Sequence, residues 1–354
     1  MNAPRIPAEM KAVVTTGHGG LDKLDYRTVP VPAPAADEVL VKVAACGLNN
    51  TDIWTREGRY GTEEDPAAIA GPGRTPANFP QIQGADVVGT IVAVGSGVAA
   101  TRIGERVIVD NTIYGEDETG TGYVGSIGGT HPGGYAEYCA VPAVSAFAVR
   151  TSLSDAELAT FPCAYSTAEH MLSRACLAAG ETVLVTGASG GVGSALIQLA
   201  QARGAKAVGV ARASKLDWVR KLGPIAVIDS DAPDFAEAVR RAIGRPSLDV
   251  VADVVGGRHM RALLGLLRPL GRYVTAGAIA DPMVSLDLRT IYLKHLELAG
   301  ISLGRPEDFR ALLGYIEAGK VKPLLHKTFP LAEIRRAQTE FMQKNFTGKL
   351  VVLP

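Results

Sequence analysis

The pattern of apolar and polar positions changes near residue 154 and divides the chain into two kinds of region. Before this point, short runs rich in β-branched residues are separated by clusters of glycine and proline, a pattern typical of a β-rich domain. The runs predict strands at 10–15, 39–45, 87–94 and 106–109. Two stretches without such runs, 60–80 and 114–134, predict long loops, which are either functional or variable surface insertions.

After residue 154, short apolar runs alternate with helical patterns. Ser154 or Asp155 is the predicted N-cap of the first helix. The strands predicted next are 182–186, 207–211, 225–228, 248–254, 271–276 and 296–301, with helices at 191–203, 214–222, 232–243 and 258–268. Two helical segments, 306–318 and 331–344, and a strand at 349–353 follow. This alternation predicts an α/β fold with a doubly wound parallel sheet.

A turn of small residues joins the first strand of that sheet to its helix. The turn and helix start read Ala188-Ser189-Gly190-Gly191-Val192-Gly193. Free N–H groups and the dipole at such a helix N-terminus hold a pyrophosphate. Gly190 is expected to let the backbone approach the phosphates, and Gly193 to let the helix pack close to the sheet. Ala188 stands where the first glycine of G-x-G-x-x-G is usual. The order of strand, turn, helix and strand predicts a dinucleotide-binding (Rossmann) domain.

The residues after the second strand of this sheet indicate which dinucleotide is bound. NAD-selective sheets place a carboxylate there for the ribose 2′-OH, whereas NADP-selective ones place cationic and hydroxyl groups for the 2′-phosphate. This chain has Arg212, Ser214 and Lys215, with no acid before Asp217. Arginine pairs with phosphate through its planar fork and lysine as a point charge. We therefore expect NADP(H); a solvated basic helix start is the alternative.

The amino-acid composition excludes some classes of binding partner for this protein. The 354 residues are 47% hydrophobic and 20% charged, with 36 basic and 36 acidic residues, so neither nucleic acid nor an anionic membrane is an expected partner. No apolar run is long enough to span a membrane, and the first residues lack the apolar core of a secretion signal. The four cysteines are scattered and predict reduced thiols, so we expect a cytoplasmic enzyme.

Segments along nearly the whole chain resemble the medium-chain dehydrogenase/reductase superfamily. They are Ala44-Ala45-Cys46-Gly47 with Asn49 and Asp52, Gly84-Ala85-Asp86-Val87-Val88-Gly89, Gly104-Glu105-Arg106-Val107, Gly134-Tyr135-Ala136-Glu137-Tyr138 and Gly348-Lys349. The resemblance implies a β-rich, GroES-like catalytic domain at 1–155, the dinucleotide-binding domain at 156–303 and a return to the catalytic domain at 304–354. It also implies a homodimer, because in relatives the edge strand, here 296–301, pairs with its twin across a two-fold axis.

The alcohol dehydrogenases of this superfamily carry a catalytic zinc on Cys, His and Cys. At the first two ligand positions this chain has Asn49 and Ala85, and only Cys163 falls where the third belongs. Zinc needs about three protein ligands and one open position, so we expect no metal. The structural zinc loop is also missing, since 112–130 contains no cysteine. Rescue of the metal by Cys163, Asp86 and a histidine is the alternative.

The metal-free branch that the chain resembles comprises quinone oxidoreductases and enoyl reductases. Its G-V-N-x-x-D segment is mirrored by Gly47-Leu48-Asn49-Asn50-Thr51-Asp52. Without a Lewis acid, hydride suits acceptors that delocalise the incoming charge themselves. The expected reaction is hydride transfer from NADPH to an electron-poor small molecule, either an activated C=C bond or a quinone. A zinc alcohol dehydrogenase with unusual ligands and a catalytically silent NADPH-binding protein are the alternatives.

The resemblance also assigns catalytic residues. Asn49 is expected to be an active-site amide that donates to the substrate or holds the nicotinamide ribose; a simple turn residue is the alternative. Many relatives have a tyrosine five residues later, where this chain has Trp54, which cannot deliver a phenolic proton. Tyr60, close by in sequence, is the substitute to test as proton donor; a tyrosine on the loop surface is the alternative.

Further residues are expected around the cofactor and in support of the site. The expected cofactor neighbours are Thr167, Gly277 and Lys349; for Lys349, an ordinary lysine at a strand start is the alternative. Asp86 occupies the position of a supporting carboxylate, and we expect it to pair with Arg56 or Arg106 in a structural role.

Overall fold

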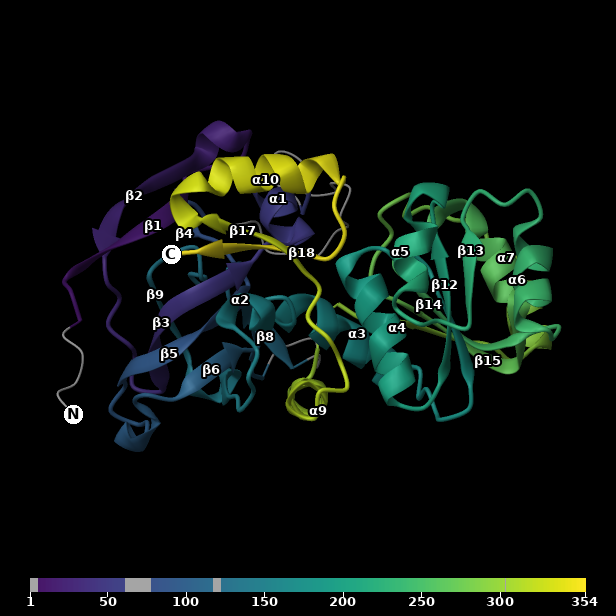
Figure 1. Ribbon diagram of the computed structural model, residues 1–354, viewed down its shortest axis with the longest axis horizontal. Coiled ribbons are helices and arrows are strands. Elements are labelled where there is room, and N and C mark those ends of the chain that lie inside the picture. Colours follow the sequence, from purple (N-terminus) through teal and green to yellow (C-terminus); the bar gives the residue numbers. More distant parts are fainter. Residues whose placement is uncertain (1–5, 61–77, 117–121, 303) are drawn as a thin grey trace. The chain divides into compact units, whose positions relative to one another are not determined.

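The computed structural model describes residues 6–60, 78–116, 122–302 and 304–354 (Figure 1). The chain divides into two compact units: the first comprises Met1–Cys163 with Pro323–Pro354, and the second comprises Ala164–Lys322. Most of the loop predicted at 60–80 lies outside the described residues. Each unit has its own sheet and its own apolar core.

The first unit is built on a seven-stranded sheet in the order β10-β6-β5-β3-β18-β17, with β9 also paired to β3. Its strands are β3 (Glu38–Gly47), β5 (Asp86–Val94), β6 (Arg106–Val109), β9 (Tyr138–Pro142), β10 (Ala146–Ala148), β17 (Leu325–Pro330) and β18 (Lys349–Leu353). Alternate residues of β3, among them Val39, Val41 and Val43, are buried in the core of this unit. β3 is buried over most of its length, which suits a strand in the middle of the sheet.

The last strand brings the C-terminal end of the chain back to this sheet. β18 runs parallel to β17 and antiparallel to β3, with Val351 opposite Gly47 and Val352 opposite Cys46. The ladder continues past the strand end, because the Leu48 N–H donates to the Leu350 carbonyl at 2.9 Å. This register places the start of β18 beside the residues that follow β3.

Two smaller sheets complete the β structure of the first unit. They are β2-β1-β4, formed by β1 (Glu9–Thr15), β2 (Leu24–Pro30) and β4 (Gln81–Ile82), and a hairpin of β7 (Thr112–Tyr114) and β8 (Tyr123–Ser126). The prediction of one loop over 114–134 was wrong at this hairpin, and Ile127 beyond it is buried. β8 has only four residues and carries a glycine, so its apolar pattern is too short to be recognised without its partner strand.

Three α-helices pack in the described part of the first unit. They are α1 (Asn50–Arg56), α2 (Asp155–Leu158) and α10 (Ile334–Gln343), and α10 lies against β17 and β18 (Figure 1). The predicted cap of α2 is confirmed, since the Glu157 N–H donates to Ser154 Oγ at 3.3 Å. Arg56, which is only 1% exposed, donates to the Gly19 carbonyl and to Gln338 Oε1, and so ties α1 to α10.

The second unit is a six-stranded, entirely parallel sheet in the order β13-β12-β11-β14-β15-β16. Its strands are β11 (Thr182–Val185), β12 (Lys206–Ala211), β13 (Ala226–Asp229), β14 (Leu248–Asp253), β15 (Leu267–Thr275) and β16 (Glu297–Gly300). α4 (Gly191–Ala202) lies on one side of the sheet, and α6 (Phe235–Ile243) and α7 (Met260–Leu266) lie on the other (Figure 1). This arrangement confirms the predicted doubly wound α/β fold.

The remaining helices of the second unit are α3 (Pro162–Arg174), α5 (Leu216–Arg220), α8 (Leu288–Leu293) and α9 (Pro306–Glu317). The segment after α9 is held to this unit through the backbone of Lys322. The Lys322 N–H donates to Gln198 Oε1 at 2.8 Å, and the Lys322 carbonyl accepts from the Tyr165 hydroxyl at 3.1 Å. The chain returns to the first unit after these partly buried contacts, at residue 323, whereas the sequence placed the return at 304. Among the described residues, no helix is long and apolar enough to cross a membrane.

Candidate active site

A buried polar cluster lies in the first unit where β3 ends and where β5 and β18 begin. Lys349 Nζ donates to Asn49 Oδ1 at 2.6 Å and forms an ion pair with Asp86 Oδ2 at 2.6 Å. Asp86 is 0% exposed, Lys349 5% and Asn49 8%. A buried ion pair needs this close geometry to offset desolvation, so removing either charge alone leaves the other uncompensated.

Two glycines lie next to this cluster, and neither leaves space for a side chain. A Cβ at Gly47 would lie 2.7 Å from Asp86 Oδ2 and 2.3 Å from the Ala159 carbonyl oxygen. Gly348 has a φ of +84°, and a Cβ there would lie 2.1 Å from the Leu324 carbonyl oxygen. Only glycine fits at either position, because the clashing atoms belong to backbone or to a buried carboxylate.

A second carboxylate supports the backbone of Asn49. Asp52 Oδ2 accepts from the Asn49 N–H at 2.7 Å and from the Tyr135 hydroxyl at 2.7 Å. Burial raises the pKa of Asp52 to about 6, although both hydrogen bonds act in the opposite direction. Burial also raises the pKa of Tyr135 well above its usual value, so its hydroxyl remains a donor. Sequence reasoning missed the Tyr135 contact; Asp52, three residues after the N-cap Asn49, was a visible signal.

The structure places the predicted catalytic residues in two groups. Asn49 is the N-cap residue of α1, and its side chain belongs to the buried cluster. Among the described residues, none receives the hydrogens of Asn49 Nδ2, which is itself buried. Trp54 and Tyr60 form a pair of tilted rings with centroids 5.8 Å apart, and Trp54 packs against the core of the first unit. The role of Tyr60 as a proton donor stays a prediction.

The expected partner of Asp86 was wrong. Arg106 pairs with Asp155 at 2.6 Å, and Arg56 is engaged with backbone and amide oxygens near α10. Asp86 pairs with Lys349 instead, because the register of β18 against β3 brings in a residue from the far end of the chain. Whether Lys349 also reaches a cofactor stays a prediction.

The donor set at the three zinc-ligand positions does not fit a zinc ion. Asp86 Oδ1 accepts from the Cys163 N–H at 2.8 Å, and Oδ2 forms an ion pair with the Lys349 ammonium, so both oxygens already have partners. Asn49 offers a neutral amide and Ala85 a methyl group. Among the residues that the structure describes, no group of three His, Cys, Asp or Glu side chains could hold a metal. A tetrahedral zinc site needs three such ligands.

The glycine turn of the second unit has the geometry of a phosphate-binding turn. α4 begins at Gly191 with Gly190 as its N-cap, so its first N–H groups have no partner within the helix. A Cβ at Gly193 would lie 2.1 Å from the Gly187 carbonyl oxygen, so the helix packs against the turn as predicted. A Cβ at Gly190 would meet only the Gly187 oxygen, at 3.3 Å, so the protein leaves space on this side of the turn.

The replacement of the first motif glycine also has a structural reason. Ala188 is fully buried, and its Cβ would lie 3.2 Å from a Cβ at Gly209 on β12. The methyl group therefore fills space between the turn and the sheet. Ser189 and Val192 stay partly exposed at the helix start.

The basic residues follow the carboxyl end of β12. Arg212 and Ser214 are exposed and Lys215 is half-buried, in a short 3-10 turn, Ala213–Lys215. The first acid in this segment, Asp217, is paired with Arg220 one turn further along. The segment therefore offers cationic and hydroxyl groups, which suit a phosphate.

A buried carboxylate that sequence reasoning missed holds the strand ends together. Asp253, 0% exposed, accepts from the Thr186 hydroxyl, from the Tyr273 hydroxyl at 2.6 Å and from the Val255 N–H at 2.9 Å. It joins the carboxyl ends of β11, β14 and β15, where ligands bind in such sheets. Its position as an acid at the carboxyl end of an apolar strand was a signal that could have found it.

Two other predicted cofactor residues lie in the second unit. Thr167 is half-buried within α3. A Cβ at Gly277 would meet only the Val254 carbonyl oxygen, at 3.6 Å, so the backbone there is open to a ligand. Their contact with a cofactor stays a prediction.

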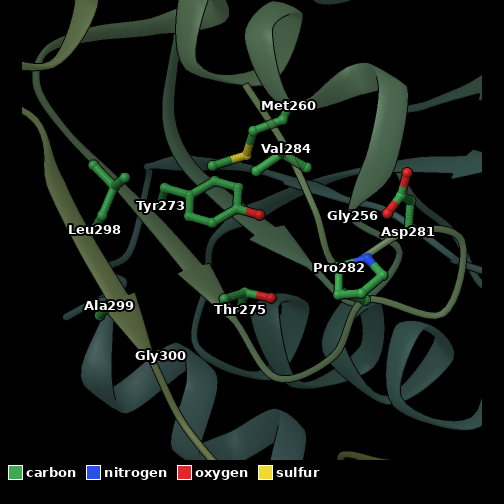
Figure 2. Close-up of a pocket in the computed structure, with 11 residues that line it drawn as sticks. Gly256, Met260, Tyr273, Thr275, Asp281, Pro282, Val284, Leu298, Ala299 and Gly300 are labelled. Atoms are coloured by element: carbon green, nitrogen blue, oxygen red, sulfur yellow. The ribbon is translucent and has the colours of Figure 1, made fainter. Parts of the chain in front are cut away.

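A pocket of about 270 Å³ lies beside the edge strand β16 (Figure 2). Figure 2 shows Tyr273 and Leu298, from β15 and β16, with Met260 and Val284 at one end of the pocket and Thr275 near the other. Its lining is largely apolar, and Leu298 remains 39% exposed at the sheet edge.

The two units together define the class of protein. Residues 35–151 match the alcohol dehydrogenase GroES-like domain, and residues 191–318 match the zinc-binding dehydrogenase family. The chain therefore belongs to the medium-chain dehydrogenase/reductase superfamily of oxidoreductases, with a GroES-like domain and a parallel-sheet nucleotide-binding domain.

Three similar proteins illustrate the range of this superfamily. A candidate alcohol dehydrogenase from Sinorhizobium meliloti 1021 has 58% identity and a TM-score of 0.91, over 99% of this chain and 98% of its own. The NADPH-dependent alkenal/one oxidoreductase of Arabidopsis thaliana chloroplasts is 31% identical over 99% of this chain and 81% of its own. The quinone oxidoreductase of Homo sapiens is 29% identical over 97% of this chain and 98% of its own.

Proposed function

We propose that this chain is an NADPH-dependent reductase that transfers hydride, without a metal, to an activated C=C bond or a quinone. The observation that carries the proposal is the contact of Lys349 with both Asn49 and Asp86. An amide occupies the first zinc-ligand position of the superfamily and contacts a buried ammonium. The site therefore offers hydrogen-bond donors and a buried cation rather than a Lewis acid.

The absence of a Lewis acid from the proposed mechanism limits which hydride acceptors can be reduced. Reducing an unactivated ketone needs strong polarisation of its oxygen, which a metal supplies. A conjugated carbonyl or a quinone spreads the incoming electron pair over several atoms, so positioned donors are sufficient. The similarity to an alkenal/one oxidoreductase and to a quinone oxidoreductase supports this class of acceptor.

The proposed cofactor is NADP(H), which supplies the hydride when bound. The N–H groups at the start of α4 would hold the pyrophosphate, and Arg212, Ser214 and Lys215 would hold the 2′-phosphate. Gly190 leaves space for that approach.

The test combines metal analysis with turnover. Purified protein is analysed for zinc and assayed for NADPH consumption with benzoquinones, naphthoquinones, alkenals, alkenones and an enoyl thioester. We expect metal-free protein to reduce at least one of these classes and to be insensitive to chelators. Stoichiometric zinc that is required for activity would overturn the proposal.

A second candidate function is alcohol oxidation, favoured by the 58% identity to a candidate alcohol dehydrogenase. It predicts zinc in the purified protein and nicotinamide reduction with simple alcohols. Tight NADPH binding without turnover of any acceptor would instead indicate a catalytically silent binding protein. The same assay therefore separates all three.

A further inference from the structure

Asn49 carries a buried donor with no receiver among the residues that the structure describes. The residue is 8% exposed, and its Nδ2 is buried without a hydrogen-bond partner. Buried polar groups are almost always paired, and an exception in a native protein calls for an explanation. A ligand group that accepts hydrogen bonds would supply the missing partner.

The orientation of this amide is set by its neighbour. A lysine ammonium has three donors and no acceptor, so it can contact only the oxygen of the amide. Lys349 Nζ lies 2.6 Å from Asn49 Oδ1, which turns Nδ2 away from the cation. Rotating the amide by half a turn would place its N–H groups against the ammonium.

The ammonium is itself held in place. It pairs with Asp86 Oδ2 at 2.6 Å, and Asp86 Oδ1 accepts from the Cys163 N–H at 2.8 Å. From the other side, Asp52 Oδ2 holds the backbone N–H of Asn49 at 2.7 Å. Both ends of the asparagine are therefore anchored to buried groups.

We propose that Lys349 is a positioning residue that keeps the Nδ2 hydrogens of Asn49 available to the carbonyl oxygen of the acceptor. This inference rests on the proposed function, and it narrows the substrate class to acceptors whose oxygen is conjugated with the reduced bond. Hydride leaves NADPH with its electron pair and forms a C–H bond at the distal carbon of the C=C. The π pair moves onto the oxygen as an enolate, which water then protonates. In a quinone, the ring carbon that received the hydride afterwards loses a proton as the product tautomerises to the hydroquinone. The amide N–H donates to that oxygen as its charge develops.

The first variant removes the donor and keeps the shape. In Asn49→Asp, a carboxylate of equal size faces Lys349, so the contact with the ammonium is kept. Thermal stability is expected to fall modestly, because one ammonium then faces two buried carboxylates. An acceptor oxygen now stands where Nδ2 was. We expect kcat/KM for an alkenone to fall by about 100-fold, the loss typical of one oxyanion donor, with NADPH affinity unchanged.

The second variant removes the orienting contact. Lys349→Met alone would leave Asp86 buried and uncompensated, so Lys349→Met is combined with Asp86→Asn, which removes both charges. We expect kcat to fall by about tenfold or more as the amide loses its fixed orientation. Lys349→Arg keeps a cationic donor and is expected to retain more of the rate than the double variant.

A second lysine–asparagine pair, at the residue after Asn49, provides a matched control. Lys344 Nζ donates to Asn50 Oδ1 at 2.8 Å, in an exposed pair of the same two residue types. Lys344→Met is expected to leave both kcat and NADPH affinity unchanged.

The outcomes separate this inference from the function that it rests on. If the wild-type protein reduces no conjugated acceptor, the proposed function fails. If it does, but the Lys349→Met/Asp86→Asn variant keeps the wild-type rate, the positioning role is wrong. If Asn49→Asp weakens NADPH binding instead of acceptor turnover, the amide serves the nicotinamide ribose and the inference is overturned.

Discussion

Tyr135 donates its phenolic hydrogen to Asp52 Oδ2 at 2.7 Å, and both side chains are buried, 0% and 2% exposed respectively. The same oxygen accepts the N–H of Asn49 at the start of α1. A side-chain pair drawn from two distant segments thus holds the backbone of the proposed catalytic asparagine. It also places an ionisable carboxyl group in a setting that disfavours its charged form.

The pH dependence of stability is expected to reveal Asp52. Burial raises its pKa from 3.8 to about 6. Between these values the native state keeps a proton that the unfolded chain has released, so the free energy of unfolding falls as pH rises, and the effect is complete above about pH 6. We expect the difference between wild type and Asp52→Asn to change by about 3 kcal/mol across this range. Urea unfolding at several pH values measures it.

A control follows from the hydrogen bond to Tyr135. The bond lowers the pKa of Asp52, so Tyr135→Phe is expected to shift the pH-dependent range upward. A difference curve for Asp52→Asn that is flat between about pH 4 and pH 6 would contradict a proton on Asp52.

Gly47 is expected to tolerate no side chain. In Gly47→Ala, the new Cβ would press on the Ala159 carbonyl oxygen and on Asp86 Oδ2. We expect a loss of about 1–3 kcal/mol in the free energy of unfolding, the usual cost of overpacking, and a larger relative loss of activity because Asp86 must move. Chemical unfolding and turnover give the two values. Gly17→Ala, whose Cβ would meet no atom within 4 Å among the residues that the structure describes, is the matched control and is expected to be neutral.

The basic segment after β12 is expected to select the phosphorylated cofactor. Arg212→Ala/Lys215→Ala should weaken NADPH binding on the order of 10- to 100-fold, because contacts from charged donors to phosphate are lost, and should leave NADH binding unchanged. Fluorescence titration measures both affinities. Arg220→Ala removes a nearby cation that is paired with Asp217 and serves as the control. An equal loss for both cofactors would mean that this segment does not contact the 2′-phosphate.

We propose that the exposed edge of the second unit pairs with a second copy of the chain. β16 is the last strand of its sheet, and Leu298 on it is 39% exposed. Large apolar side chains gather in the preceding segment: Met283 81%, Leu288 67%, Tyr292 60% and Leu293 69% exposed. Unpaired strand edges and exposed apolar surface are typical of interfaces.

Light scattering on the eluting protein tests this pairing. We expect twice the 37.0 kDa chain mass for the wild type and a shift toward monomer for Leu298→Lys, which places a charge at the sheet edge. Val144→Lys, at an apolar residue 78% exposed in the first unit, should leave the mass unchanged. A wild-type mass of one chain would rule out the proposed dimer.

Local sequence patterns were sufficient for most of the architecture. The alternation of strands and helices after residue 154 predicted each strand of the parallel sheet, and the Ser154 cap was found in place. Such predictions work because a period of two or 3.6, a capping residue and a small-residue turn each depend on neighbours within a few positions. The β7–β8 hairpin was missed because its strands are too short to carry a period.

The sequence by itself therefore determined the two kinds of fold, the glycine turn of α4 and the presence of Asn49 where a metal ligand is usual. Only the tertiary structure decided that Lys349, 300 residues away, contacts Asn49, that Asp86 pairs with this lysine rather than with an arginine, and that Tyr135 supports Asp52. The physical reason is that the pairing of β18 with β3 depends on a shared core and a strand register, and neither leaves a trace in the local pattern of either segment.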